Sequence, residues 1–445
     1  MGDELALAQD RLLRAIARAR AGQEPGLAQK VRRRGESAAQ LLGGLLRAGR
    51  SRPADPRAFD SQLEQLARAL GELVGWLGVA RFQTLDGQIY LGELGLRGDV
   101  GSSARALVEE LAKHEVGGLC FRAPPDGAAA RALVAALTAK PAGVDPCQAL
   151  RVELARQRAL SVEPAPRGPG PEGEADERRR PGESAARMAR LVAEALAAAA
   201  EGRAPEVLPL RRAVADLLDG GLEAPEAWEA LSDATTPPAH AALVALVAML
   251  VGSGAGLRRA VLQDLGVAAL LHDLGYASAR AGRGREGLLG HPGEGVRIML
   301  RQAGFGEGKV RRLRAVLDHH RDHAEPRGAP SGLGQMLRLA DDYATACRLG
   351  AGRVTPADVL GAMVHEAGNA YHPALLQTMI NVLGGHPPGT LLELTDGRLA
   401  RSVSPVRRPG TFATPLVRVQ VAGAQAPTPL LDLAAEGGVR RALPG

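Results

Sequence analysis

The sequence is poor in aromatic residues and in cysteine, and both shortages exclude certain classes of protein. Aromatic residues make up 2% of the 445 residues, so the hydrophobic cores must be built from leucine, valine and alanine. No basic stretch is interleaved with aromatic residues, which argues against a nucleic-acid-binding surface. The three cysteines, Cys120, Cys147 and Cys347, are far apart and match no zinc or disulfide pattern, so we interpret them as reduced core thiols.

Long apolar segments are missing as well. The N-terminal stretch MGDELALAQDRLLRA is acidic and then amphipathic, without the apolar region of a signal peptide. The longest apolar run, AALVALVAMLVG, is too short to span a bilayer and is typical of a buried helix. We therefore predict a cytoplasmic protein that has no membrane partner.

Lysine is scarce, so arginine carries almost all of the positive charge. The formal net charge is +6, a mild bias toward anionic partners, which could be phosphates as easily as nucleic acid. Abundant alanine, glycine, proline and arginine are typical of a GC-rich bacterial genome. The number of arginines is therefore weak evidence for any particular site.

A stretch rich in proline, glycine and charge divides the chain. Residues 161–184, SVEPAPRGPGPEGEADERRRPGES, cannot bury apolar surface, which predicts a disordered linker. Residues 1–160 contain helical patterns, an Asp86-Gly87 hairpin signal, a helix over 103–114, the strand-like VGGLCF and a helix from Gly127. They predict a small α/β domain. It carries no chemical motif, which favours a regulatory or dimerisation role.

One helix of this domain has apolar residues at heptad spacing. Phe59, Leu66 and Leu73 interleave with Leu63, Leu70 and Leu77, and the stripe is too short for a coiled coil. We interpret it as core packing rather than as a dimer seam.

After the linker the pattern becomes helical. Residues 185–385 show no strand signal, whereas residues 386–445 contain an Asp396-Gly397 turn and the alternating PLVRVQVAG. The predicted fold class is therefore mostly α: a helical bundle preceded by a small α/β domain and followed by a short β-hairpin extension.

An adjacent histidine and aspartate end one of the predicted helices. In AALLHDLGYA, His272 and Asp273 follow an apolar run that Gly275 then breaks. A buried carboxylate needs a partner that offsets its lost hydration. An arginine, a set of backbone donors or a metal ion could each serve.

Further imidazoles and carboxylates follow the same pattern. His240 follows Pro237-Pro238 at a predicted helix start, His291 precedes Pro292 at another, and His319-His320 end a helix. Asp341 shares a helix face with apolar residues. Each alone is explained by a hydrogen-bonded core histidine or by a capping or arginine-paired aspartate. Together they suit two metal ions that share a carboxylate, with iron, manganese, zinc or nickel as candidates.

The series H, HD, HP, HH, D resembles the HD superfamily of metal phosphohydrolases. It is most similar to the HD-GYP branch, whose members hydrolyse cyclic diguanylate. The resemblance runs from about Ser184 to Leu383 and continues into GHPPGTLLELTDGRLARSV. It implies an HD-type helical bundle with His272 and Asp273 at the catalytic centre and Asp273 bridging two divalent ions. The metal ligands it implies are His240, His272, Asp273, His291, His319, His320 and Asp341.

The chain also departs from this family. Tyr276 replaces the lysine of HDxGK, and HHExxDGxGYP becomes HHRDHAEPRGAP, with Arg321 in place of the glutamate. Thr236 stands where three-metal members carry a glutamate, which predicts two ions. Candidate residues for binding the substrate phosphates are Arg280, Arg283, Arg285 and Arg321. The alternative for the first three is a solvated loop.

These observations predict a two-metal phosphodiesterase acting on cyclic diguanylate or another phosphorylated nucleotide. The alternative is a non-catalytic signalling module that keeps metal for folding and binds a nucleotide or protein partner. A two-iron oxygenase shares similar ligands but is disfavoured by the HP and HH motifs. The N-terminal domain would mediate homodimerisation or bind a signalling partner.

Overall fold

The computed structural model contains two compact units, formed by Met1–Glu172 with Ala303–Gly306 and by Gly173–Gln302 with Glu307–Gly445. The structure describes residues 27–51, 59–85, 88–92, 94–96, 102–141, 145–157, 159–164, 181–232, 234–278, 280, 282, 284–302, 307–326, 328–420, 428 and 430–444.

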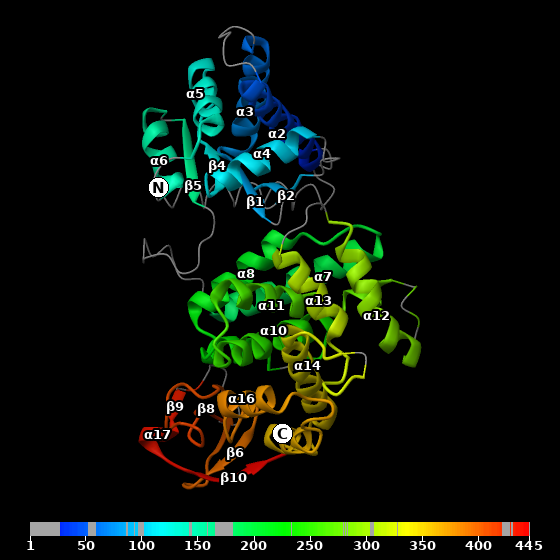
Figure 1. The fold of residues 1–445 in the computed structure, drawn as a ribbon. Helices are drawn as coiled ribbons and strands as arrows, with labels where there is room; N and C mark the ends of the chain where they lie inside the picture. Colours follow the sequence, from blue (N-terminus) through cyan, green and yellow to red (C-terminus); the bar gives the residue numbers. More distant parts are fainter. Residues whose placement is uncertain are drawn as a thin grey trace. The chain divides into compact units, whose positions relative to one another are not determined.

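The N-terminal unit is an antiparallel sheet packed with helices (Figure 1). The strand order is β3-β2-β1-β4-β5. Strands β1 and β2 pair with Leu85 opposite Gln88, as a hairpin requires, while Asp86 and Gly87 lie outside the described residues. Its elements are α2 (Leu27–Ser51), α3 (Asp60–Leu77), β1 (Ala80–Leu85), β2 (Gln88–Leu91), β3 (Leu94–Gly95), α4 (Ser102–Lys113), β4 (Val116–Phe121), α5 (Gly127–Thr138), α6 (Pro146–Glu153), η1 (Leu154–Arg156) and β5 (Leu160–Pro164).

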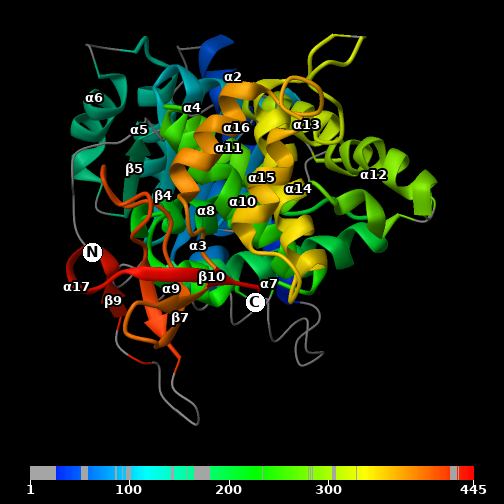
Figure 2. The same ribbon diagram turned by 90° about the horizontal axis from the view of Figure 1, so that it is seen from below.

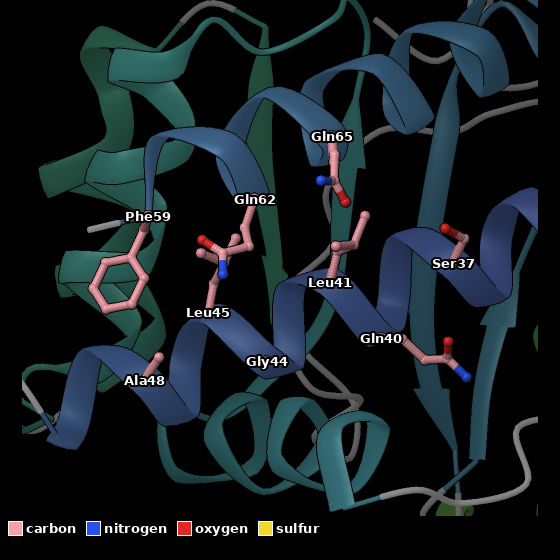
Figure 3. Close-up of a pocket in the computed structure, with 9 residues that line it drawn as sticks. All are labelled: Ser37, Gln40, Leu41, Gly44, Leu45, Ala48, Phe59, Gln62 and Gln65. Carbon is pink, nitrogen blue, oxygen red and sulfur yellow. The ribbon is translucent and has the colours of Figure 1, made fainter. Parts of the chain in front are cut away.

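The leucine stripe of α3 belongs to the core of this unit. Leu63, Leu66, Leu70, Leu73 and Leu77 are all buried, and Phe59 packs against them, as core packing predicts. A shallow groove of about 350 Å³ lies between α2 and α3 (Figure 3). Its lining of glutamine, serine and apolar residues carries no charge. The predicted regulatory or dimerisation role stays a prediction.

The predicted linker is wrong at both ends. Residues 161–164 belong to β5, which pairs with β4 over Leu160–Pro164, and α7 begins at Pro181 with Ser184 fully buried. The pairing with β4 satisfies the backbone of a segment whose composition is typical of a linker. Residues 165–180 lie outside the described residues.

The second unit begins with a helical bundle centred on α10 (Figures 1 and 2). Helix α10 packs against α7, α11, α14 and α16. It is the one described helix long and apolar enough to cross a membrane, but 67% of it is buried inside the unit. The elements are α7 (Pro181–Ala200), α8 (Val207–Gly220), α9 (Pro225–Ala230), α10 (Pro237–Gly254), α11 (Arg259–Leu270), η2 (Leu274–Ala277), α12 (Gly284–Met299), α13 (Glu307–Asp318), α14 (Gly332–Gly350), α15 (Pro356–Val364) and α16 (Pro373–Leu383).

The predicted helix start at His291 is wrong. Helix α12 begins at Gly284, so His291 and Pro292 lie inside it. Proline has no N–H for the Leu288 carbonyl, but Leu288 is 46% exposed and water can satisfy that group. The ring of His291 also bonds the Gly287 carbonyl, which stabilises the turn before the proline.

The C-terminal extension is larger than a hairpin. It forms a five-stranded antiparallel sheet in the order β10-β6-β7-β8-β9, at one end of the bundle (Figure 1). The Asp396-Gly397 turn joins β6 to β7 as predicted, with Gly397 at φ 86°. The extension belongs to the same compact unit as the bundle. Its elements are β6 (Leu391–Leu394), β7 (Leu399–Ser402), β8 (Leu416–Val419), β9 (Leu430–Asp432), α17 (Leu433–Glu436) and β10 (Val439–Leu443).

Candidate metal centre

Five segments of the bundle bring the predicted ligands together. His240 lies in the first turn of α10, which the Thr236 side chain caps. The other six lie in the turn between α11 and η2 (His272, Asp273), in the middle of α12 (His291), just after α13 (His319, His320) and on the inward face of α14 (Asp341). The structure thus gathers all seven predicted side chains in one place.

Backbone carbonyls fix the orientation of the three most buried histidines. Nδ1 lies 2.7 Å from the Ala269 carbonyl oxygen in His272, 3.0 Å from that of Gly287 in His291 and 2.6 Å from that of Val316 in His319. A carbonyl only accepts, so each Nδ1 carries a hydrogen and each ring directs its Nε2 inward, with a lone pair there whenever the ring is neutral. This is the tautomer that metal-bound histidines commonly use.

The inward nitrogens face one another instead of finding donors. His291 Nε2 and His319 Nε2 are 3.2 Å apart, and with hydrogens on both Nδ1 atoms there is none to share between them. The buried His272 Nε2 makes no hydrogen bond to any described residue. Convergent lone pairs in a closed interior are costly unless a cation lies among them. The donor set therefore fits a metal ion.

Two carboxylates complete the cluster. The two oxygens of Asp273 face different histidines, with Oδ2 3.3 Å from His272 Nε2 and Oδ1 3.3 Å from His291 Nε2. Asp341 Oδ1 lies 2.9 Å from His240 Nε2 and 3.7 Å from His272 Nε2. Among the described residues, the ligand sets with mutually close donor atoms include His240-His272-Asp273, His272-His319-Asp341 and His291-His319-His320.

The charges of the cluster also favour a cation. Burial alone would lower the pKa of His272, but Asp273 and Asp341 outweigh it and raise that pKa well above its ordinary value. Burial lowers the pKa of His320 to about 4 and that of His319 well below its ordinary value. Without metal, then, one protonated imidazole partly balances two carboxylates while two imidazoles keep free lone pairs.

A glycine allows the His272-Asp273 turn to approach α12. A Cβ on Gly275 would lie 1.9 Å from the His291 carbonyl oxygen and 2.8 Å from the Gly295 backbone nitrogen. No side chain fits there. Gly275 therefore does more than end the helix, because it lets His272 and His291 reach the same centre.

Asp318 anchors the turn that carries His319 and His320. It is buried, and it accepts hydrogen bonds from Arg314, Arg321 and the Ser331 backbone N–H. Although burial opposes ionisation, these bonds lower the pKa of Asp318. Sequence reasoning missed this residue, although its position directly before the HH pair was a signal.

The cluster opens into a pocket of about 570 Å³. His272, His291 and His319 are fully buried beneath it. Four other cluster residues line it: His240, Asp273, His320 and Asp341. Tyr276, which also lines it, stacks on His291 with ring centroids 4.0 Å apart. Among the described residues, solvent therefore reaches the cluster from the side formed by His240, Asp273, His320 and Asp341.

The arginines near the pocket differ from those predicted. Arg321 donates to Asp318 and to the Gly328 carbonyl, and neither it nor the exposed Arg280 lines the pocket. Arg283 and the side chain of Arg285 lie outside the described residues. Arg338 and Arg348 line the pocket instead. Their spacing of three and seven residues from Asp341 puts them on its helix face, a signal available in the sequence.

Arg338 is held in position by its neighbours. It lies 2.8 Å from Asp322 and 3.3 Å from Asp342, and it donates to the His320 carbonyl. Asp342 also accepts from the Tyr371 hydroxyl. Among the described residues, no carboxylate pairs with Arg348.

Residues 239–346 match the family model of the HD domain. The match supports the HD superfamily of metal-dependent phosphohydrolases, and its span includes all seven clustered side chains. Comparisons with curated proteins and with solved structures find no match to this chain.

Proposed function

We propose that the chain is a phosphodiesterase that hydrolyses cyclic diguanylate or a related phosphorylated nucleotide at a centre of two divalent metal ions. The observation that carries this proposal is the convergence of seven imidazole and carboxylate groups, among which the buried His272 Nε2 makes no hydrogen bond to any described residue. The match of residues 239–346 to the HD domain supports hydrolysis of a phosphate ester. We further propose a bacterial cytoplasmic protein whose N-terminal unit binds a signalling partner or a second copy.

Two groups of ligands would share Asp273. One comprises His240, His272 and Asp341, and the other comprises His291, His319 and His320. Asp273 directs one oxygen toward His272 and the other toward His291, as a bridging carboxylate would. Divalent ions bound here would neutralise phosphate charge and activate water. Iron, manganese, zinc and nickel all accept this donor set.

The open side of the pocket would bind the substrate. The Arg338 guanidinium is already oriented by Asp322 and Asp342, so it can present fixed N–H groups to a phosphate. Tyr276 stands at the position where the family carries lysine. Burial raises the pKa of its hydroxyl, which stays protonated near neutral pH and can donate to a phosphate oxygen. The site would therefore present the neutral Tyr276 hydroxyl to the phosphate where the family presents a lysine cation.

A hydrolysis assay tests the proposal. Protein purified without oxygen is loaded with Mn²⁺ or Fe²⁺ under reducing conditions, and cyclic diguanylate is followed by chromatography. We expect a linear product from the wild type and none from Asp273→Asn. Full metal loading with no product from cyclic diguanylate or from other cyclic dinucleotides would contradict the proposal.

A non-catalytic signalling module is the second candidate. Two observations favour it. Tyr276 stands in place of lysine, and Arg321 donates hydrogen bonds to Asp318 and the Gly328 carbonyl, which stabilise its own loop. In that case the metal-loaded protein would bind the nucleotide and return it unchanged. Measuring binding and turnover on the same preparation separates the two functions.

A further inference from the structure

A second cavity adjoins the pocket above the histidine cluster. It has a volume of about 510 Å³ and lies between α14, the segment after α9 and the C-terminal sheet. Thr235 and Arg348 line both cavities. The two cavities therefore share a border at Thr235 and Arg348.

The lining of this cavity has an excess of positive charge. It carries three arginines, Arg348, Arg401 and Arg418, and one carboxylate, Glu229. Arg418 is committed to Glu229, with its Nη2 2.8 Å from Oε2. Arg401 donates from Nη1 to the Gly389 carbonyl, and among the described residues neither it nor Arg348 has a carboxylate partner. A guanidinium group can bind a phosphate through two parallel hydrogen bonds, so two arginines without a carboxylate partner in one cavity favour an anionic ligand.

We propose that this cavity is a second substrate subsite that binds the phosphate of a dinucleotide which is not being hydrolysed. The inference rests on the proposed function, because it requires a phosphodiester at the metal cluster. Arg348, at the border, and Arg401, on β7, would bind the second phosphate. Leu243 and Val403 would contact the attached nucleoside. The C-terminal sheet is then part of the binding site, and it would favour substrates with two phosphates over those with one.

Two substrates separate this subsite from the metal pocket. The metal-loaded full chain is assayed with cyclic diguanylate and with bis(4-nitrophenyl) phosphate, which has one phosphate and no nucleoside. Arg401→Gln removes a proposed phosphate ligand, and Ala351→Trp fills the cavity from an exposed position. Arg353→Gln is the matched control, because Arg353 is exposed and, within the described part of the chain, its side chain donates to the Leu349 carbonyl alone.

We expect both cavity variants to lose about tenfold more kcat/KM on cyclic diguanylate than on the small diester, mainly through KM. The control should retain activity on both substrates. Equal losses on the two substrates would overturn the proposal.

Calorimetric binding of cyclic diguanylate to the metal-loaded protein is measured in parallel. A dissociation constant about tenfold higher for Arg401→Gln supports the subsite, even if the wild type hydrolyses neither substrate and the proposed function fails. No binding to the wild type, or equal binding to both proteins, would overturn the subsite whatever the activity.

Discussion

Two buried polar clusters, one at the middle of α11 and one just beyond its C-terminal end, are built in opposite ways. Asp264, 1% exposed, receives hydrogen bonds from Arg211, Arg311 and Arg312 on both of its oxygens. Beyond the C-terminal end of the helix, Asp273 is surrounded by imidazole nitrogens that face one another. In the first cluster, arginines donate hydrogen bonds to the carboxylate. In the second, carboxylate oxygens and imidazole nitrogens, which are all potential acceptors, point toward one another.

The difference distinguishes a structural cluster from a binding site. A buried carboxylate with matched arginines needs nothing more, and it ties α8, α11 and α13 together. Convergent acceptors need a cation from outside the chain. The sequence allowed an arginine, a set of backbone donors or a metal ion as the partner of a buried aspartate. The bundle uses arginines for Asp264 and the metal-type donor set for Asp273.

The largest expected effect is on the stability of the protein, when the carboxylate of the arginine cluster is removed. Asp264→Ala removes the buried carboxylate that Arg211, Arg311 and Arg312 share, so the free energy of unfolding should fall by about 3–5 kcal/mol. The control, Asp219→Ala, removes an exposed partner of Arg259 and should cost about 1 kcal/mol or less. Urea denaturation of the metal-free proteins measures both. Equal losses would mean that Asp264 is no more structural than a surface aspartate.

The matching change in the histidine cluster should lower metal affinity rather than the stability of the metal-free protein. Asp273→Asn keeps the shape but removes a charge, and metal affinity should fall by at least about a hundredfold. Stability without metal should change much less than in Asp264→Ala. Elemental analysis and calorimetry measure the first quantity and denaturation the second. Wild-type metal affinity in Asp273→Asn would contradict the assignment.

The contact between η2 and α12 provides the third test. Gly275→Ala places a Cβ against the His291 carbonyl and should lower the free energy of unfolding by about 1–3 kcal/mol. Because His291 moves with α12, metal affinity should fall too. Gly293 lies in α12, and no atom lies within 4 Å of the Cβ that Gly293→Ala would add. This control should instead stabilise the protein by about 0.5–1 kcal/mol. Unchanged metal affinity in Gly275→Ala would show that this contact does not position His291.

Metal affinity should also depend on pH. The raised pKa of His272 means that the metal-free cluster holds a proton near neutral pH, and a metal ion must displace it. The affinity should therefore rise about tenfold per pH unit between about pH 6 and pH 8, for one proton released. Chelator competition measures the slope. His323→Gln, outside the cluster, should keep that slope, and a pH-independent affinity would contradict protonation of His272.

The smallest effect concerns Tyr276. Tyr276→Phe keeps the stacking on His291 but removes the hydroxyl, so kcat/KM on cyclic diguanylate should fall about two- to tenfold with metal affinity unchanged. Tyr276→Leu also removes the stacking and should weaken metal binding. Wild-type kinetics for Tyr276→Phe would rule out a role for the hydroxyl.

Local sequence signals anticipated the fold where the determinants are local. The structure contains the turn at Asp396-Gly397 between β6 and β7, the heptad leucines in α3 and the proline start of α10. The errors arose where distant contacts outweigh local preference. Residues 161–164 form a strand because β4 is there to pair with them, and α12 continues through Pro292 because its exposed first turns tolerate a missing hydrogen bond.

The sequence by itself determined that helices dominate, that imidazoles and carboxylates recur at their ends, and that a glycine follows the His-Asp pair, because these are properties of short segments. Only the tertiary structure decided which groups meet. His240 and Asp341 are 101 residues apart yet 2.9 Å from each other, while Arg321 turns to Asp318 and Arg338 and Arg348 line the pocket. Side-chain partners depend on how helices pack, and that packing is set by the whole core rather than by any one motif.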